Sequence, residues 1–304
     1  GPGAGKTRVL VSRFARLVND QGVSPRRILA LTFANKAAGE MRARLAALVG
    51  PEQAASVEVS TFHAFGLQLL QQYGERIGLK TPVRLITPMD ALLLLRRRAA
   101  RMALGIFSDL PKAMESLKGL LDAVGRSKEE AAGPERWEAL ARTWREENPD
   151  AAQTPAPAWI EDGIPFYREY QATLRRHGLL DYGDLQCEAL RLLTEQPDVA
   201  REVRERYAHI LVDEFQDINY VSGRLVRELD GGRGVVWVVG DPRQSIYGFR
   251  GASPVNLSRF RADDYYPGAR VIPLTTNYRS LPEIVAAGSA VPIPALAEDP
   301  ALLP

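Results

Sequence analysis

The sequence contains almost no cysteine, and its apolar stretches are short. Cys187 is the one cysteine among 304 residues, which excludes an intramolecular disulfide and a multi-cysteine metal site. The longest apolar runs reach about half the length of a membrane-spanning helix. The first residues, GPGAGKT, carry no apolar signal-peptide core. We therefore expect no membrane segment and a cytoplasmic location.

Lysine is also scarce, and neither sign of charge dominates. The chain has 33 arginines, six lysines and 37 acidic residues, which gives a net charge of +2. This balance excludes a histone-like polycation but permits a local nucleic-acid channel. Arginine binds phosphate in a bidentate manner, yet we interpret most of the arginine excess as the mark of a GC-rich genome.

A short apolar run, a polar turn and a helix follow one another repeatedly along the chain. The runs predicted as strands are Ile28–Phe33, Val57–Ser60, Ile210–Val212 and Val235–Val239, with Val271–Leu274 as a fifth candidate. Alternating strands and helices, with fully apolar strands, indicate an α/β fold whose parallel sheet is covered on both faces. Polar residues after each strand would then line the carboxyl edge, where ligands bind in such sheets.

This alternation stops between residues 84 and 185, where the pattern is helical. The predicted helices there are Asp90–Leu104, Pro111–Val124, Pro134–Glu147 and Pro165–Arg176. We therefore expect an all-helical subdomain over 84–185, inserted into an α/β domain made of residues 1–83 and 186–289. The tail, 290–304, is rich in Pro, Ala and Leu and shows no periodicity.

The segment Gly3–Thr7, GAGKT, matches the end of a phosphate-binding P-loop. In such a loop the glycines let backbone N–H groups surround phosphate oxygens, the lysine reaches the β and γ phosphates, and the hydroxyl binds Mg²⁺. The positive end of the following helix adds to the attraction. A chance glycine-rich turn is the alternative for this motif alone. Because no strand leads into the loop, we expect the chain to be a fragment.

Asp213 and Glu214 directly follow an apolar strand, in the manner of a Walker B pair. The aspartate would hold Mg²⁺, and the glutamate would accept a proton from the attacking water. Two solvated acids at a strand end are the alternative. Together with GAGKT, the pair predicts a site that hydrolyses a nucleoside triphosphate.

Six motifs, one of which contains Asp213 and Glu214, indicate what this site drives. In chain order they are LTFANKAAGEM, STFHAF, LLDYGDL, ILVDEFQDIN, VGDPRQSIYGFRGA and LTTNYRS. Their content and order resemble the motifs of UvrD/Rep/PcrA-type superfamily 1A DNA helicases, over nearly the whole chain. The resemblance implies a RecA-like P-loop NTPase domain (1A) with a helical insert (1B). It also implies ATP-dependent 3′→5′ translocation on single-stranded DNA, and unwinding at ss/ds junctions in DNA repair or recombination.

The resemblance assigns roles in ATP hydrolysis to residues of the GAGKT, DEFQD, GDPRQ and NYRS segments. Glu214 would be the catalytic base, Gln244 the γ-phosphate sensor and Arg279 an arginine finger. Gln216 and Asp217 would position the site, and Thr7 with Asp213 would hold Mg²⁺. The implied ATP-binding residues are Gly3, Ala4, Gly5, Lys6, Thr7, Arg8, Gln244, Tyr278 and Arg279. The family's second RecA-like domain would follow residues 290–304, and without it we expect poor ATP hydrolysis and no unwinding.

The same motifs imply a DNA-binding edge at which bases stack on aromatic rings. Stacking suits a translocating motor because every base offers a π face. The implied DNA-binding residues are Phe33, Asn35, Phe62, His63, Tyr247, Phe249 and Arg250. Phe33 as a core residue, His63 as a helix cap and Tyr247 as buried packing are the alternatives that the sequence leaves open.

Two other functions remain compatible with parts of the sequence. Pro242 and Arg243 resemble residues of the helicase subunits of helicase–nuclease complexes of the RecB/AddA type, whose nuclease domain would lie well beyond Pro304. A passive single-strand-binding module would fit a fragment. The retained carboxylate of Glu214 argues against that module, because a relative that does not hydrolyse ATP is expected to have lost it.

Overall fold

The computed structural model of the chain describes residues 2–99, 110–148, 159–246, 257, 260 and 266–290. The chain divides into two compact units, one made of Gly1–Phe65 with Leu193–Pro304 and the other of Gly66–Leu192. The second unit includes the whole predicted insert, 84–185, and extends beyond it at both ends. The boundaries 84 and 185 stay predictions.

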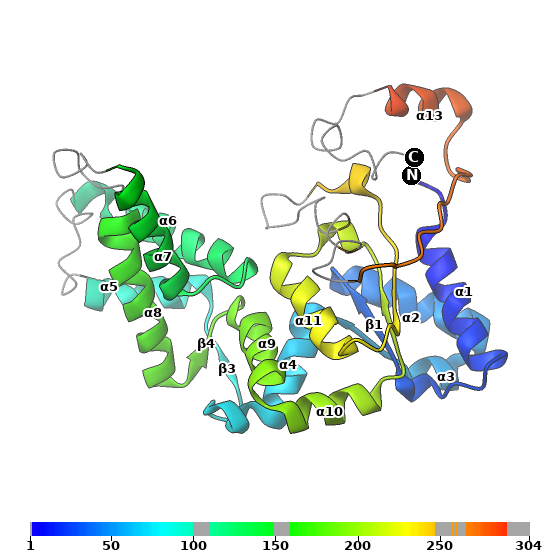
Figure 1. Cartoon of the computed structure of the whole chain (residues 1–304), viewed down its shortest axis with the longest axis horizontal. Coiled ribbons are helices and arrows are strands. Elements are labelled where there is room, and N and C mark those ends of the chain that lie inside the picture. Colours follow the sequence, from blue (N-terminus) through cyan, green and yellow to red (C-terminus); the bar gives the residue numbers. More distant parts are fainter. Residues whose placement is uncertain are drawn as a thin grey trace. The chain divides into compact units, whose positions relative to one another are not determined.

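The first unit is built on a four-stranded sheet in the order β2–β1–β5–β6 (Figure 1). The strands are β1 (Ile28–Thr32), β2 (Glu58–Thr61), β5 (His209–Val212) and β6 (Val236–Val238). All neighbouring pairs are parallel. The predicted α/β fold with a parallel sheet is confirmed, and no end of these four strands differs from the predicted end by more than one residue.

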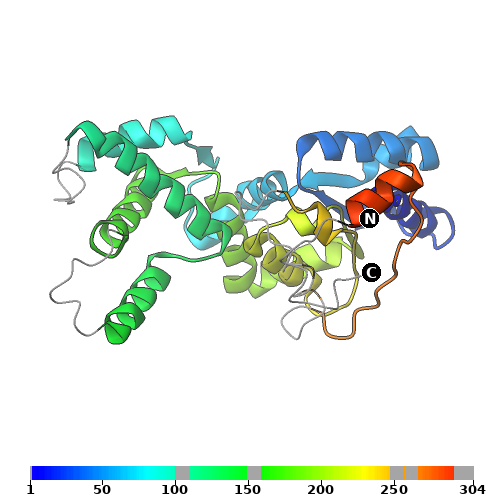
Figure 2. The same cartoon turned by 90° about the horizontal axis from the view of Figure 1, so that it is seen from above.

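The connections reverse direction at the centre of this sheet. From β1 the chain passes through α2 (Asn35–Val49) and α3 (Pro51–Ser56) to β2 on one side, whereas α11 (Tyr220–Asp230) leads from β5 to β6 on the other. Because such crossovers are right-handed, α2 and α11 cover opposite faces, as Figures 1 and 2 show. The reversal creates a switch point between β1 and β5, where ligands bind in open α/β sheets.

Both faces of the sheet are sealed by apolar side chains. On one face, Phe14 and Leu17 of α1 (Lys6–Asn19) and Met41 of α2 join Ala30 of β1 in a single cluster. The alternate residues Leu29 and Leu31 belong to the opposite face and are also fully buried. Truncating a buried residue such as Phe14 to alanine lowers the free energy of unfolding by about 3–5 kcal/mol. Packing of this strength holds the ends of the strands in fixed positions.

The fifth predicted strand is wrong. Residues Val271–Leu274 belong to no strand, and Val271 and Ile272 are 59% and 53% exposed. Their β-branched side chains favour an extended backbone, but a strand also needs a neighbour, and no described residue pairs with them. The remaining helical elements that lie in this unit or span its boundaries are η1 (Pro25–Arg27), α4 (Phe62–Tyr73), α9 (Asp184–Glu195), α10 (Pro197–Arg206), η6 (Phe215–Asp217), η7 (Pro242–Gln244) and α13 (Pro282–Ser289).

The second unit is helical apart from one short pair of strands. Its elements are η2 (Gly74–Ile77), α5 (Pro88–Ala99), α6 (Leu110–Glu129), α7 (Pro134–Glu147), η5 (Trp159–Gly163) and α8 (Ile164–His177). The strands β3 (Arg84–Leu85) and β4 (Leu179–Leu180) pair in parallel. The expectation of an all-helical insert missed them, because two residues are too few to show a periodicity. Among the described helices of the chain, none is long and apolar enough to cross a bilayer.

A buried ionic cluster lies in the second unit beside its aromatic core. The Lys128 ammonium, 2% exposed, lies 2.6 Å from Asp181 Oδ2 and 2.7 Å from Asp184 Oδ1. The Tyr170 hydroxyl donates to Asp181 Oδ2 at 2.7 Å, and the Cys187 thiol donates to the Lys128 carbonyl at 3.2 Å. One ammonium thus joins α6 to the turn between β4 and α9. Sequence analysis did not single out this cluster.

Candidate functional site

The phosphate-loop residues lie where the chain enters α1. Gly5 adopts φ +80°, a conformation that side chains resist, and α1 begins at Lys6. The first turn of α1 contains no acidic residue and no side-chain cap. Its N–H groups are therefore available to an anion, which the helix dipole also favours.

Hydrogen bonds from backbone N–H groups fix the positions of the two acids at the end of β5. The Asp213 N–H donates to the Leu31 carbonyl at 3.0 Å, which ties the end of β5 to β1 at the switch point. Glu214 adopts a left-handed conformation with φ 49°, and its N–H donates to Asp213 Oδ1 at 3.0 Å. Such backbone strain costs about 1–3 kcal/mol in a non-glycine residue and concentrates at functional sites.

The phosphate loop and the two acids meet. Lys6 Nζ lies 3.9 Å from Glu214 Oε2, and the Thr7 hydroxyl is hydrogen-bonded to the Asp213 carboxylate. Burial raises the pKa of Asp213, and the neighbouring charge of Glu214 raises it further, while Thr7 and Lys6 oppose the shift. A cation bound at this point would reduce the electrostatic repulsion between the two carboxylates. A hydroxyl and a carboxylate oxygen are ligands that suit Mg²⁺, which is often completed by phosphate oxygens and water.

Gln216 and Asp217 lie directly behind Asp213 and Glu214. The Gln216 amide nitrogen donates to Glu214 Oε2 at 2.9 Å and to Asp217 Oδ2 at 3.1 Å. Burial, followed by the charge of Glu214, raises the pKa of Asp217 to about 6. The structure therefore brings the DEFQD residues into one hydrogen-bonded group.

Gln244 follows β6 and is held by an aspartate that sequence analysis did not single out. Asp241 is 5% exposed and accepts hydrogen bonds from the Arg243 N–H, at 3.1 Å, and from the Gln244 side-chain amide. The signal was present, because Asp241 belongs to the GDPRQ segment. Its role as a holder of the glutamine depends on a side-chain contact that the motif does not reveal.

The NYRS segment contacts the phosphate loop through Asn277, which sequence analysis also missed. The Asn277 amide donates to the Pro2 carbonyl at 2.6 Å, and its oxygen accepts from the N–H groups of Arg279 and Ser280. The Tyr278 N–H donates to the Gly3 carbonyl at 3.0 Å. A Cβ on Gly3 would lie only 2.6 Å from Arg279 Cβ, so this contact requires glycine.

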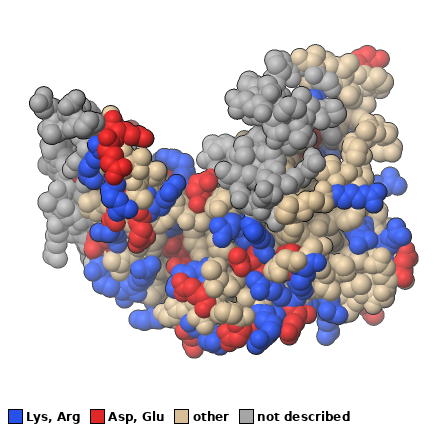
Figure 3. Space-filling model, in the orientation of Figure 1, with Lys and Arg blue, Asp and Glu red and all other residues tan. Residues whose placement is uncertain are grey.

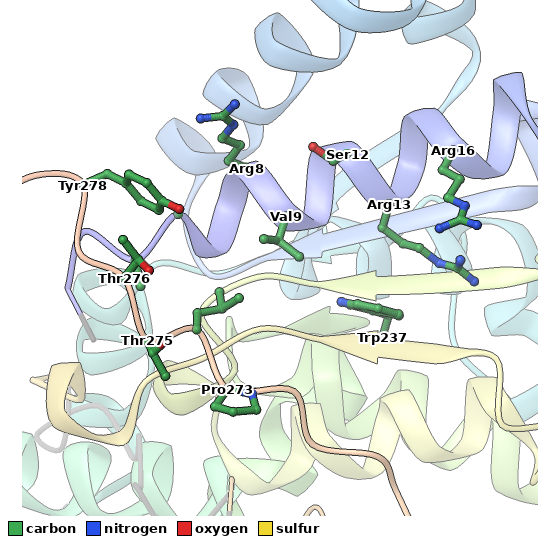
Figure 4. A pocket seen from close by; sticks show the side chains of 13 residues that line it. Arg8, Val9, Ser12, Arg13, Arg16, Trp237, Pro273, Thr275, Thr276 and Tyr278 are labelled. Carbon is green, nitrogen blue, oxygen red and sulfur yellow. The ribbon is translucent and has the colours of Figure 1, made fainter. Parts of the chain in front are cut away.

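A pocket of about 740 Å³ opens between α1 and residues Pro273–Tyr278. Figure 4 shows the Tyr278 ring beside the start of α1, the helix that carries Arg8. Both side chains line the pocket, and Tyr278 is 76% exposed. An exposed ring and a guanidinium beside a phosphate loop are suited to holding a planar base.

The residues predicted to bind DNA have different environments. Phe33 is half-buried and Asn35 is exposed, both just beyond β1. Phe62 is 3% exposed, so its ring packs in the core and offers no face to a base. His63 is half-buried at the start of α4. Tyr247, Phe249 and Arg250 lie outside the described residues.

Burial lowers the pKa of His63 to about 4. The imidazole is therefore neutral at physiological pH, and a DNA contact there would depend on stacking or hydrogen bonding without ionic attraction. We expect a histidine NMR titration to give His63 an apparent pKa below 5, with His63→Gln identifying its signal. An apparent pKa near 6.5 would show that the ring is solvated.

The surface shows no broad basic face in the view of Figure 3. Lysine and arginine side chains are interspersed with acidic ones over the described residues. Bulk charge therefore gives little attraction to a polyanion, which agrees with the net charge of +2. Binding of a nucleic acid would depend on a few placed groups.

The fold and the site together define an α/β nucleotide-binding domain of the P-loop type, with its acidic pair at the sheet's switch point. Comparison with known families makes the assignment specific, because residues 1–264 match the model of the UvrD/REP helicase N-terminal domain. The chain belongs to this family, and its parallel sheet is RecA-like.

Three curated relatives illustrate the similarity. DNA helicase II of Escherichia coli K12 is 35% identical over 295 residues, and the PcrA helicase of Leuconostoc citreum is 36% identical over 291. The UvrD1 helicase of Mycobacterium tuberculosis H37Rv is 38% identical over 299 residues. Each comparison covers 96% of this chain but only 36–37% of the relative. The chain therefore spans little more than a third of these proteins.

Proposed function

We propose that this chain is the ATP-binding part of an ATP-dependent DNA helicase that translocates 3′→5′ on single-stranded DNA. The observation that carries the proposal is the meeting of Lys6 and Thr7 with Asp213 and Glu214 at the switch point of the sheet. Membership of the UvrD/REP family, whose curated relatives are named DNA helicases, supports the coupling to DNA.

The residues of the site divide the work of phosphoryl transfer. Lys6 and the N–H groups of α1 bind the phosphates, and Thr7 with Asp213 hold Mg²⁺, which neutralises charge on the phosphate oxygens when bound. Glu214 accepts the proton of the attacking water. Gln244 lies within the same hydrogen-bonded group and senses the γ-phosphate, while Tyr278 and Arg8 hold the adenine.

The remaining part of the catalytic site comes from a second RecA-like domain. Arg279 is exposed in the described structure and is available to meet nucleotide at the boundary between two such domains. DNA passes along the carboxyl edge, where Phe33, Asn35 and His63 follow the strands, and reaches the segment that contains Tyr247, Phe249 and Arg250. The proposed substrates are single strands and ss/ds junctions, and the proposed location is the nucleoid in the cytoplasm.

Lys6→Ala tests the phosphate site. We expect it to raise the Kd for ATP and to abolish DNA-stimulated ATP hydrolysis in the full-length protein, because the loop loses the cation that reaches the terminal phosphates. Nucleotide binding is measured by calorimetry and hydrolysis by phosphate release. Lys118→Ala, an exposed lysine of α6, is the control. Equal hydrolysis by the Lys6 variant and the wild type would refute the proposed function.

A passive single-strand-binding module is the competing function. It predicts DNA binding without ATP turnover by the wild-type protein. The position of Glu214, beside Lys6 and next to the proposed Mg²⁺ ligand, favours hydrolysis instead.

A further inference from the structure

Gln216 occupies a central position behind the proposed catalytic base. Its side chain is 1% exposed, in the short helical turn η6 that follows Glu214. Both ends of its amide are used: the nitrogen donates to Glu214 and Asp217, and Oε1 accepts from the Asp241 N–H at 2.9 Å. One side chain thus connects the loop after β5 to the loop after β6.

The connection extends to Gln244. Asp241, which donates its N–H to Gln216, accepts the side-chain amide of Gln244 on its carboxylate. An unbroken chain of hydrogen bonds therefore runs from Glu214 through Gln216 and Asp241 to Gln244. The Ser245 hydroxyl adds a second link by donating to the Gln216 carbonyl at 3.2 Å.

The backbone is shaped to permit this contact. A Cβ at Gly240 would lie 2.9 Å from Gln216 Oε1, closer than such atoms approach. Glycine at this position therefore lets the loop after β6 come close to the glutamine. The Phe215 N–H also donates to the Val239 carbonyl at 2.9 Å, so the residue before Gln216 is joined to the end of β6 as well.

We propose that Gln216 is a positioning residue that couples the catalytic base to the loop carrying Gln244, and through it to bound DNA. Displacement of that loop moves Asp241, which pulls on Gln216 Oε1 and alters the hydrogen bond from its nitrogen to Glu214. This inference rests on the proposed function. It predicts that Gln216 sets how strongly DNA accelerates hydrolysis.

Two substitutions in the full-length protein separate the two ends of the amide. Gln216→Met keeps the volume and removes both ends, whereas Gln216→Glu keeps the acceptor for Asp241 and removes the donor to Glu214. The readout is the ratio of ATP turnover with saturating oligo-dT to turnover without DNA. We expect both variants to lower this ratio at least about fivefold, the lower end of usual coupling between sites.

Gln186 provides the matched control, because it is a glutamine of the other unit that is 3% exposed. Like the Gln216 variants, Gln186→Met and Gln186→Glu lower the stability of the fold by altering a buried amide. A loss of folded protein lowers both turnover rates together and leaves their ratio unchanged. We therefore expect the Gln186 variants to keep the wild-type ratio.

Three outcomes are distinguishable. Wild-type protein without DNA-stimulated hydrolysis contradicts the proposed function itself. Stimulated wild type together with an unchanged ratio in the folded Gln216→Met variant overturns the role of Gln216. A ratio that falls in both Gln216 variants and persists in both Gln186 variants supports the coupling.

Discussion

We expect Glu214→Gln to lower DNA-stimulated ATP hydrolysis by about 10²–10⁴-fold, the usual contribution of a general base. The substitution keeps the size of the side chain but removes the carboxylate that we propose accepts the water proton. Lys6 and Thr7 stay in place, so nucleotide binding should persist. Phosphate release measures the loss, and binding of a fluorescent ATP analogue shows that the site remains intact.

Glu205→Gln is the control for this substitution, because Glu205 is an exposed glutamate of α10 in the same unit. It removes the same charge away from the site and should leave hydrolysis near the wild-type rate. If Glu214→Gln also hydrolyses ATP at the wild-type rate, Glu214 is not the base. The left-handed backbone conformation of Glu214 would then need another explanation.

The elements that sequence analysis predicted well are those whose signal is local. Four strands were visible because each is an apolar run followed by a polar turn, and burial on both faces produces that composition. The meeting of Lys6 with Glu214 was predicted from two motifs, because a P-loop and a Walker B pair act on the same nucleotide. Glycines of the phosphate loop were visible because few other residues tolerate φ near +80°.

The features that sequence analysis missed depend on contacts between distant residues. Asn277 contacts Pro2 across 275 positions, and Gln216 contacts Asp241 across 25. Nothing in the local pattern specifies which polar atom a buried amide will meet. Phe62 shows the converse, because an aromatic residue in a recognisable motif is buried at 3% exposure. Motif membership did not reveal the direction of its ring.

The Lys128 cluster is the clearest case of such a long-range arrangement, and it leads to the second large effect. Lys128 and Asp181 lie 53 positions apart, yet their charged atoms approach to 2.6 Å. Burial favours the neutral forms of all three groups, but the two carboxylates keep the pKa of Lys128 raised. The ammonium in turn lowers the pKa of Asp181, whereas burial raises that of Asp184 to about 6.

We expect Lys128→Met to destabilise the second unit by about 3–5 kcal/mol, because removing one partner of a buried ion pair leaves uncompensated charge. Cys187 reports this change directly. Cys187 is partly exposed, but its surroundings raise the pKa of its thiol to about 12, so little reactive thiolate forms until the cluster opens. The rate of labelling by a thiol reagent, with Cys187 located by mass spectrometry, should rise by about two to four orders of magnitude. Lys118→Met, on the exposed face of the same helix, should leave the rate nearly unchanged.

The pH dependence distinguishes a charge effect from a packing effect. A carboxyl group whose folded pKa is raised binds its proton more tightly in the folded state, so its contribution to stability falls as pH rises from about 4 to about 6. Without Lys128, Asp181 loses the cation that lowers its pKa and behaves as Asp184 does. The neighbouring Tyr170 and Gln171 donate hydrogen bonds but carry no positive charge. The ratio of variant to wild-type labelling rates should therefore be larger at pH 7.5 than at pH 5.5, and a ratio independent of pH would attribute the loss to packing alone.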